Sequence, residues 1–178
     1  GQNCPDSTLY IVGLPIGNLG DITLRALWIL ALADVVAAED TRETRKLLDK
    51  FGISVKLLSV REHNERHGAE QIIELLQEGK KVTLVTDAGT PCVSDPGARA
   101  VKAVREAGFR VIPVPGASAV VTALSGAGLD GSGFTFVGFV PPQSKARRNA
   151  LAYWLARPEP FVLYEAPHRV VDLLEDLA

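Results

Sequence analysis

The sequence predicts an α/β fold made of two α/β domains, with a mostly parallel sheet in the first and a second domain that is incomplete in this chain. Short apolar, β-branched runs alternate with longer stretches in which apolar residues recur every three or four positions, which indicates strands alternating with helices. The runs are also continuously apolar, as strands covered by helices on both faces are. We therefore expect βαβ units and parallel strand pairing in the first domain.

The composition is that of an ordinary globular protein. The chain has 178 residues, of which 47% are hydrophobic and 22% charged, so it can form a core without disulfides or a structural metal. The formal net charge of −2 excludes a strongly basic nucleic-acid-binding domain, although a local basic patch remains open. The two cysteines lie far apart and match no metal-ligand spacing, which favours a reducing cytoplasm and no bound metal.

The expected strands follow one another along the whole chain. Helical patterns separate them, for example at residues 24–31 and 72–76. The strands are expected at residues 9–12, 35–38, 56–59, 82–86, 111–114, 135–139 and 161–164.

Three acidic residues indicate where helices begin. Asp21 precedes the first helical stretch, and Asp40 precedes a second one in a variant of the capping box. Asp95 stands directly before Pro96, an arrangement typical of an N-cap followed by proline at the first helical position.

A proline- and glycine-containing segment, residues 113–116, is the best candidate for a linker. We therefore expect an N-terminal tail at 1–8, a first domain at 9–113 and the first part of a C-terminal domain at 114–178. That second part is too short for a self-standing α/β layer. Its last helical pattern has no glycine or proline stop, so we expect it to be incomplete.

One uncharged stretch, residues 111–129, approaches the length needed to span a membrane. Pro113, Pro115 and Gly116 interrupt it near its start, so a strand end, a turn and a packed helix explain it better. No membrane partner is expected.

The candidate functional residues follow successive strands, at residues 13–18, 39–42, 87–91, 115–119 and 165–169. In open parallel sheets, ligands bind beyond the carboxyl ends of the strands. Each motif also has a structural explanation, such as a tight turn for 13–18 and core packing for Tyr164. Asp87 is the hardest to explain in this way, because a carboxylate at the rim of a buried sheet needs a partner.

Other residues give weaker signals. Asp40 and Ser118 can both be explained as helix caps. His63 is a catalytic-looking histidine in a polar loop, although most such histidines are solvent-exposed bystanders. Lys145, Arg147 and Arg148 have no acidic neighbour in sequence and are candidates for phosphate contacts, with a soluble helix start as the alternative. No GxGxxG, P-loop, metal cluster or Ser-His-Asp pattern is present.

Taken together, the motifs carry a resemblance that no single one would. They are Gly13–Thr23, Ala38–Arg42, Glu62–Glu65, Asp87–Pro91, Ser94–Gly97, Val114–Ala119 and Tyr164–Arg169. In this order they resemble the ribosomal RNA branch of the tetrapyrrole methylase superfamily, from about Leu9 to the last residue.

The resemblance implies an enzyme that uses S-adenosylmethionine, held in a cleft between the two domains. It implies methyl transfer to the ribose 2′-hydroxyl of a cytidine in 16S rRNA of the small ribosomal subunit, by a cytoplasmic homodimer. The implied donor-lining residues are Pro15, Asp87, Ala88, Gly89, Thr90, Pro91, Val93, Ser118, Ala119, Tyr164, Glu165 and Ala166.

The reaction also requires a proton acceptor and side chains that bind the RNA. His63, Glu65 and Glu165 are the candidate bases, and Lys145, Arg147 and Arg148 the candidate RNA contacts. Two alternatives stay open: a sibling methylase that acts on a tetrapyrrole or a protein side chain, and a non-catalytic module that binds a nucleotide-like ligand. Members of the family continue with further strands, and without them we expect a weak or absent donor site.

Overall fold

The computed structural model describes residues 3–130 and 133–178. The chain divides into two compact units, Gly1–Ala119 and Val120–Ala178. The division lies a few residues beyond the boundary expected at 113/114. The loop after the fifth strand stays with the first unit because Thr90 Oγ1 donates a hydrogen bond to the Ala117 carbonyl.

The first unit is built on a five-stranded sheet in the order β3-β2-β4-β1-β5, and every pairing in it is parallel. Helices connect the strands, as the alternating pattern predicts. The strands are β1 (Thr8–Val12), β2 (Val35–Ala38), β3 (Lys56–Ser59), β4 (Lys81–Leu84) and β5 (Arg110–Val114). The helices are α1 (Leu24–Leu32), α2 (Thr41–Lys50), α3 (Glu65–Gln77) and α4 (Ala98–Glu106), with short 3₁₀ turns η1 (Leu19–Asp21) and η2 (Glu62–Asn64).

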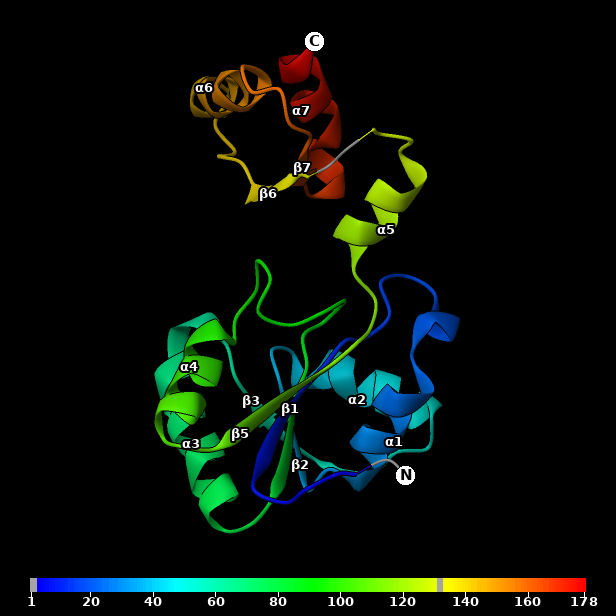
Figure 1. Cartoon of the computed structure of the whole chain (residues 1–178), viewed down its shortest axis with the longest axis vertical. Coiled ribbons are helices and arrows are strands. Elements are labelled where there is room, and N and C mark those ends of the chain that lie inside the picture. Colours follow the sequence, from blue (N-terminus) through cyan, green and yellow to red (C-terminus); the bar gives the residue numbers. More distant parts are fainter. Residues whose placement is uncertain (1–2, 131–132) are drawn as a thin grey trace. The chain divides into compact units, whose positions relative to one another are not determined.

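Helices cover both faces of this sheet (Figure 1). Side chains alternate across a strand, so Tyr10 and Val12 of β1 join the core under α1 and α2, whereas Leu9 and Ile11 join the core under α3 and α4. All four residues are at most 7% exposed. The expected doubly covered parallel sheet is therefore confirmed.

The second unit contains two parallel strands and two longer helices. β6 (Thr135–Phe139) pairs with β7 (Phe161–Tyr164), and the register shifts between Phe136 and Gly138. α6 (Ser144–Leu155) and α7 (Val170–Leu177), which follows the 3₁₀ turn η3 (Pro167–Arg169), supply Leu151 and Leu173 to a small core with Val140.

All seven expected strands are present, four of them with the expected bounds. The uncharged stretch at 111–129 is the end of β5, a loop and helix α5 (Ala119–Gly126), as expected. Within the described residues, no helix is both long enough and apolar enough to cross a membrane.

Of the three predicted helix starts, one is confirmed and two are wrong. The Asp40 carboxylate accepts hydrogen bonds from the amides of Arg42 and Glu43 and caps α2. Asp21 lies in η1 instead, and the Thr23 hydroxyl caps α1 by accepting from the Ala26 amide. Asp95 does not cap α4, because Gly97 occupies the N-cap position with a φ of 125° that favours glycine.

The N-terminus of α4 is capped by a side chain from another helix. Glu65, the first residue of α3, is only 6% exposed. Its Oε1 accepts hydrogen bonds from the amides of Gly97 at 3.0 Å, Arg99 at 2.8 Å and Ala100 at 3.4 Å. A carboxylate at this position satisfies orphan amides and favours the positive end of the helix dipole.

We predict that Glu65→Ala lowers the free energy of unfolding by at least about 2 kcal/mol, because it leaves buried amides without an acceptor. Glu65→Gln should recover part of this loss, since a carboxamide oxygen still accepts. Urea denaturation measures both changes, with the exposed Glu62→Gln as the control. A Glu65→Ala variant as stable as the control would contradict the capping role.

Candidate functional site

The loops that follow β1 and β4 meet at the carboxyl edge of the first sheet. These strands are neighbours, but the chain leaves them toward opposite faces, into α1 and α4 respectively. Such a topological switch point is where open α/β sheets bind ligands. Leu14 donates its amide to the Gly89 carbonyl at 2.9 Å, and Gly89 donates in return to the Leu14 carbonyl at 3.0 Å. The two loops therefore hold each other in place.

The loop after β5 joins this pair through a close contact between two glycines. A Cβ on Gly116 would lie 3.1 Å from Gly13 Cα, and a Cβ on Gly13 would lie 3.2 Å from Gly116 Cα. Gly89 has a φ of +76°, in the left-handed region that favours glycine. Three loops thus bring their backbones close together at one edge, an arrangement suited to holding a small ligand.

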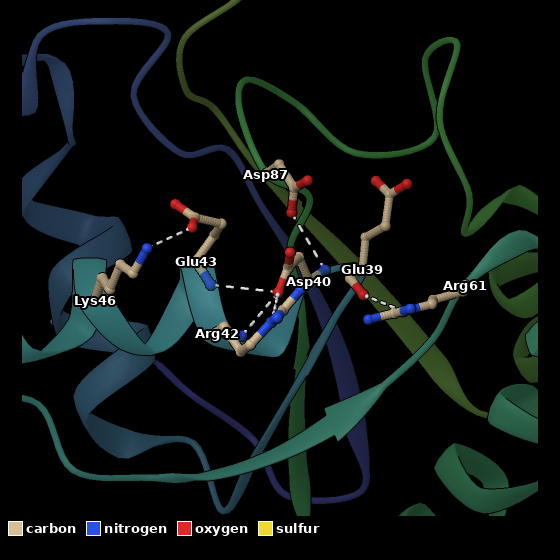
Figure 2. Close-up of polar contacts among 7 residues, drawn as sticks. All are labelled: Glu39, Asp40, Arg42, Glu43, Lys46, Arg61 and Asp87. Atoms are coloured by element: carbon tan, nitrogen blue, oxygen red, sulfur yellow. Dashed lines mark hydrogen bonds and ion pairs between the residues drawn. The ribbon is translucent and has the colours of Figure 1, made fainter.

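Acidic residues lie beside these loops, at the ends of β2 and β4 (Figure 2). The Asp40 amide donates to Asp87 Oδ1 at 3.2 Å, and Arg61 Nε donates to the Glu39 carbonyl at 3.2 Å. Burial, followed by the charges of Asp87 and Asp95, raises the pKa of Glu39. In Asp40 the hydrogen bond from the Arg42 amide is the largest influence and lowers the pKa.

The loop continues from Pro91 to Gly97 through two residues with positive φ, Cys92 at 69° and Ser94 at 64°. Asp95 Oδ1 accepts a hydrogen bond from the Val93 amide at 2.8 Å, which stabilises this turn. Burial raises the pKa of the Cys92 thiol to about 11, so the thiol stays protonated at neutral pH. Cys92 is thereby unsuited to act as a nucleophile.

The predicted donor-lining residues of the first unit fall on these loops. Those at the sheet edge are Pro15, Asp87, Ala88, Gly89, Thr90, Pro91, Ser118 and Ala119. Pro15, Gly89 and Pro91 are buried, whereas Asp87 and Ala88 are exposed. Val93 lies farther along the loop and is 45% exposed. No set of three or more metal-ligating side chains converges within residues 3–130 and 133–178.

The remaining predicted donor residues, Tyr164, Glu165 and Ala166, end β7 in the second unit. The Tyr164 ring packs edge-on against Phe136 and Phe139, with centroid distances of 4.9 and 5.8 Å. The Tyr164 side chain is half-buried and packs against these two aromatic rings.

Glu165 is held by its own neighbours. Its Oε1 accepts from the Ala166 amide at 2.7 Å and from Arg169 Nε at 2.9 Å, and these contacts, the amide first, lower the pKa of the carboxyl. The other oxygen, Oε2, is buried and has no hydrogen-bond partner among the described residues. A lowered pKa makes this carboxylate a weaker proton acceptor.

The predicted bases differ in what surrounds them. His63 is exposed on η2, where it can meet a ligand. The prediction for Glu65 is corrected, because its Oε1 is occupied by three amides of the α4 N-terminus and the residue is buried.

The predicted basic patch also needs a correction. Arg147 is 4% exposed, and its Nε forms an ion pair with Asp176 Oδ2 at 2.6 Å that joins α6 to α7. This contact, the largest influence on Asp176, lowers the pKa of its carboxyl. Arg147 therefore stabilises the second unit and is not free to contact phosphate. Lys145 and Arg148 are exposed, and Arg148 Nη1 also lies 3.5 Å from Asp176 Oδ1, so these two remain as the predicted RNA contacts.

Glu39 belongs to the strand-end candidates at residues 39–42, with a helix cap as the alternative, but the sequence assigns it no individual role. The structure places it beside Asp87, at the end of the neighbouring strand. The rule applied to Asp87 would also have singled out Glu39, because Glu39 likewise directly follows a buried strand.

Comparisons with known proteins agree with this geometry. The family model for Tetrapyrrole (Corrin/Porphyrin) Methylases matches residues 8–178. The chain is 57% identical over 171 residues to the ribosomal RNA small subunit methyltransferase I of Neisseria meningitidis serogroup B, which covers 96% of this chain and 59% of the relative. It is 52% identical over 169 residues to the protein of that name from Escherichia coli O157:H7, with coverage of 95% and 59%. The chain thus spans about three fifths of the length of these relatives.

Solved structures show the same fold. A uroporphyrin-III-C-methyltransferase from Thermus thermophilus superposes with a TM-score of 0.62 at 27% identity, covering 96% of this chain and 73% of that one. A cobalamin biosynthetic enzyme, cobalt precorrin-4 methyltransferase, gives a TM-score of 0.67 at 19% identity, with coverage of 96% and 74%. Because the family match extends over nearly the whole chain, this protein belongs to the tetrapyrrole methylase family.

Proposed function

We propose that the protein transfers a methyl group from S-adenosylmethionine to the ribose 2′-hydroxyl of a cytidine in 16S rRNA. The observation that carries the proposal is the identity of 57% and 52% to relatives named ribosomal RNA small subunit methyltransferase I. The relatives' name specifies the small-subunit rRNA. The ribose position and the base follow from the motif resemblance. We further propose that the enzyme works in the cytoplasm as a homodimer.

The loops at the carboxyl edge of the first sheet suit the donor. S-adenosylmethionine has no pyrophosphate, so the absence of a GxGxxG or P-loop motif is no obstacle. The Asp87 carboxylate is exposed and can attract the donor's cationic groups, and the left-handed Gly89 lets the ligand approach the backbone. Ser118, on the loop after β5, and Ala119, the first residue of α5, complete the proposed lining in the first unit.

When bound, the donor supplies a methyl group that its sulfonium already activates. The chain must therefore align the two reactants, exclude water and accept a proton from the hydroxyl. Among the bases expected from sequence, His63 is exposed and available. Glu165 remains a candidate, although its ion pair with Arg169 weakens it.

We predict that the protein transfers labelled methyl groups to 30S subunits that lack the modification, and that Asp87→Asn weakens donor binding about tenfold or more. Loss of a charged contact costs about 1.5 kcal/mol or more. Calorimetry with S-adenosylmethionine measures the affinity, with the exposed Asp172→Asn on α7 as the control.

The outcomes separate the competing functions. Transfer to a tetrapyrrole or to a protein side chain, but not to 30S subunits, would favour a sibling methylase. Donor binding without transfer to any ribosomal particle would favour a non-catalytic module. Unchanged affinity in Asp87→Asn would remove Asp87 from the donor site.

For the RNA contact, we predict that Lys145→Glu with Arg148→Glu weakens binding to 30S subunits and lowers the salt slope by about 2, one counterion per lost phosphate contact. The control double variant, Lys56→Glu with Lys102→Glu, changes the charge equally at exposed positions of the first unit. Filter binding at several salt concentrations measures both. If both double variants lose the same affinity for 30S subunits, the effect is one of general charge and not of a local basic patch.

A further inference from the structure

We propose that Glu39, at the carboxyl end of β2, accepts the proton of the hydroxyl that is methylated. The inference rests on the proposed function and names a residue of that same site. It follows from the position of Glu39, from the groups that surround it and from the contacts that occupy two other candidate bases, Glu65 and Glu165.

The backbone of Glu39 is held firmly while its carboxylate extends toward the candidate site. β2 pairs with β4, and the Asp40 amide donates to Asp87 Oδ1, which ties the ends of these strands together. The Glu39 carbonyl accepts from Arg61 Nε. Figure 2 shows the Glu39 side chain extending to the same side as the Asp87 carboxylate, away from this anchored backbone.

The charged groups around Glu39 come from three other segments. Asp87 follows β4, Asp95 lies in the loop before α4, and Arg61 follows β3. Burial and the two aspartates raise the pKa of Glu39, while Thr86 and Arg61 lower it, with a net rise. A carboxylate whose pKa lies above its usual range is a stronger base in its ionised form.

Thr86 adds a further constraint. This residue is 4% exposed, and its hydroxyl lowers the pKa of both Glu39 and Asp95. A hydroxyl has one hydrogen to donate, so it serves one carboxylate at a time. The other carboxylate then lies beside a like charge without that hydrogen bond. The repulsion between the two charges disfavours ionisation of both groups.

The proposed step balances. The hydroxyl oxygen forms a bond to the methyl carbon while the donor's carbon–sulfur bond breaks, and the electron pair of that bond remains on sulfur as a neutral thioether. The hydroxyl proton passes to a carboxylate oxygen of Glu39. Release of this proton to solvent then restores the base.

The test is the pH dependence of single-turnover methyl transfer to unmodified 30S subunits at saturating donor. We expect Glu39→Gln to lower the rate about 100-fold or more, within the range of general base catalysis, when calorimetry on each variant is used to choose a donor concentration that saturates it. Glu39→Asp should recover part of the rate, and His63→Ala should lose less than Glu39→Gln.

A second variant changes the pKa of Glu39 without replacing the residue. Glu39 must be ionised to accept a proton, so the rate falls as the pH drops through its pKa. Asp95→Asn removes a neighbouring negative charge and lowers that pKa, so the acid limb of the profile should move to lower pH. Asp172→Asn on α7 should leave the limb in place. Carbon-13 NMR titration of labelled glutamate in the donor-free protein should show the same shift for Glu39.

Wild-type protein that transfers no methyl group would overturn the proposed function and this inference together. Active wild type with an equally active Glu39→Gln variant would overturn the inference alone. An acid limb that Asp95→Asn does not move, while the NMR titration shows Glu39 shifted, would assign the proton to another group and also overturn it.

Discussion

The close approach of Gly13 and Gly116 is the contact on which the candidate site depends. Strands β1 and β5 are neighbours, so the loops that follow them leave the sheet side by side. They approach closely because neither residue carries a Cβ, which would lie 3.1 to 3.2 Å from the opposing Cα and force a shift of the backbone. Thr90 then reaches the Ala117 carbonyl, and the loop after β4 closes onto both. A bulkier residue at either glycine would push these loops apart at the carboxyl edge of the sheet.

Glu65 extends this arrangement to the far end of the loop after β4. That loop is fixed near its start by the Leu14–Gly89 pair and at its end by the Glu65 carboxylate on the α4 amides. Between these points, Cys92 and Ser94 adopt positive φ, a conformation that costs free energy in non-glycine residues. The two anchors offset this cost, so the loop is held in one shape before any ligand arrives.

The sequence alone was sufficient to predict which residues form the strands, but not the side-chain contacts around the ends of the strands and helices. Continuous apolar runs located every strand because a strand buried on both faces has no other sequence pattern. The predicted cap at Asp95 was wrong because this carboxylate accepts from the Val93 amide, two residues before it, and stabilises a turn there. The predicted role of Glu65 was wrong because the amides that it caps lie more than 30 residues farther along the chain, beyond the reach of a local pattern. Arg147 was assigned to RNA for the same reason, since its partner Asp176 stands in the next helix.

The positions of the charged residues matter more in this protein than its net charge. The net charge is only −2, yet Glu39, Asp87 and Asp95 lie close enough together to raise the pKa of Glu39 at the edge of the first sheet. A cationic donor would reduce their mutual repulsion, so donor binding should lower the pKa of Glu39 and favour its ionised form. The proton acceptor would then be in the correct state when both reactants are present. This coupling requires no conformational change, because the anchored loops already hold the carboxylates together.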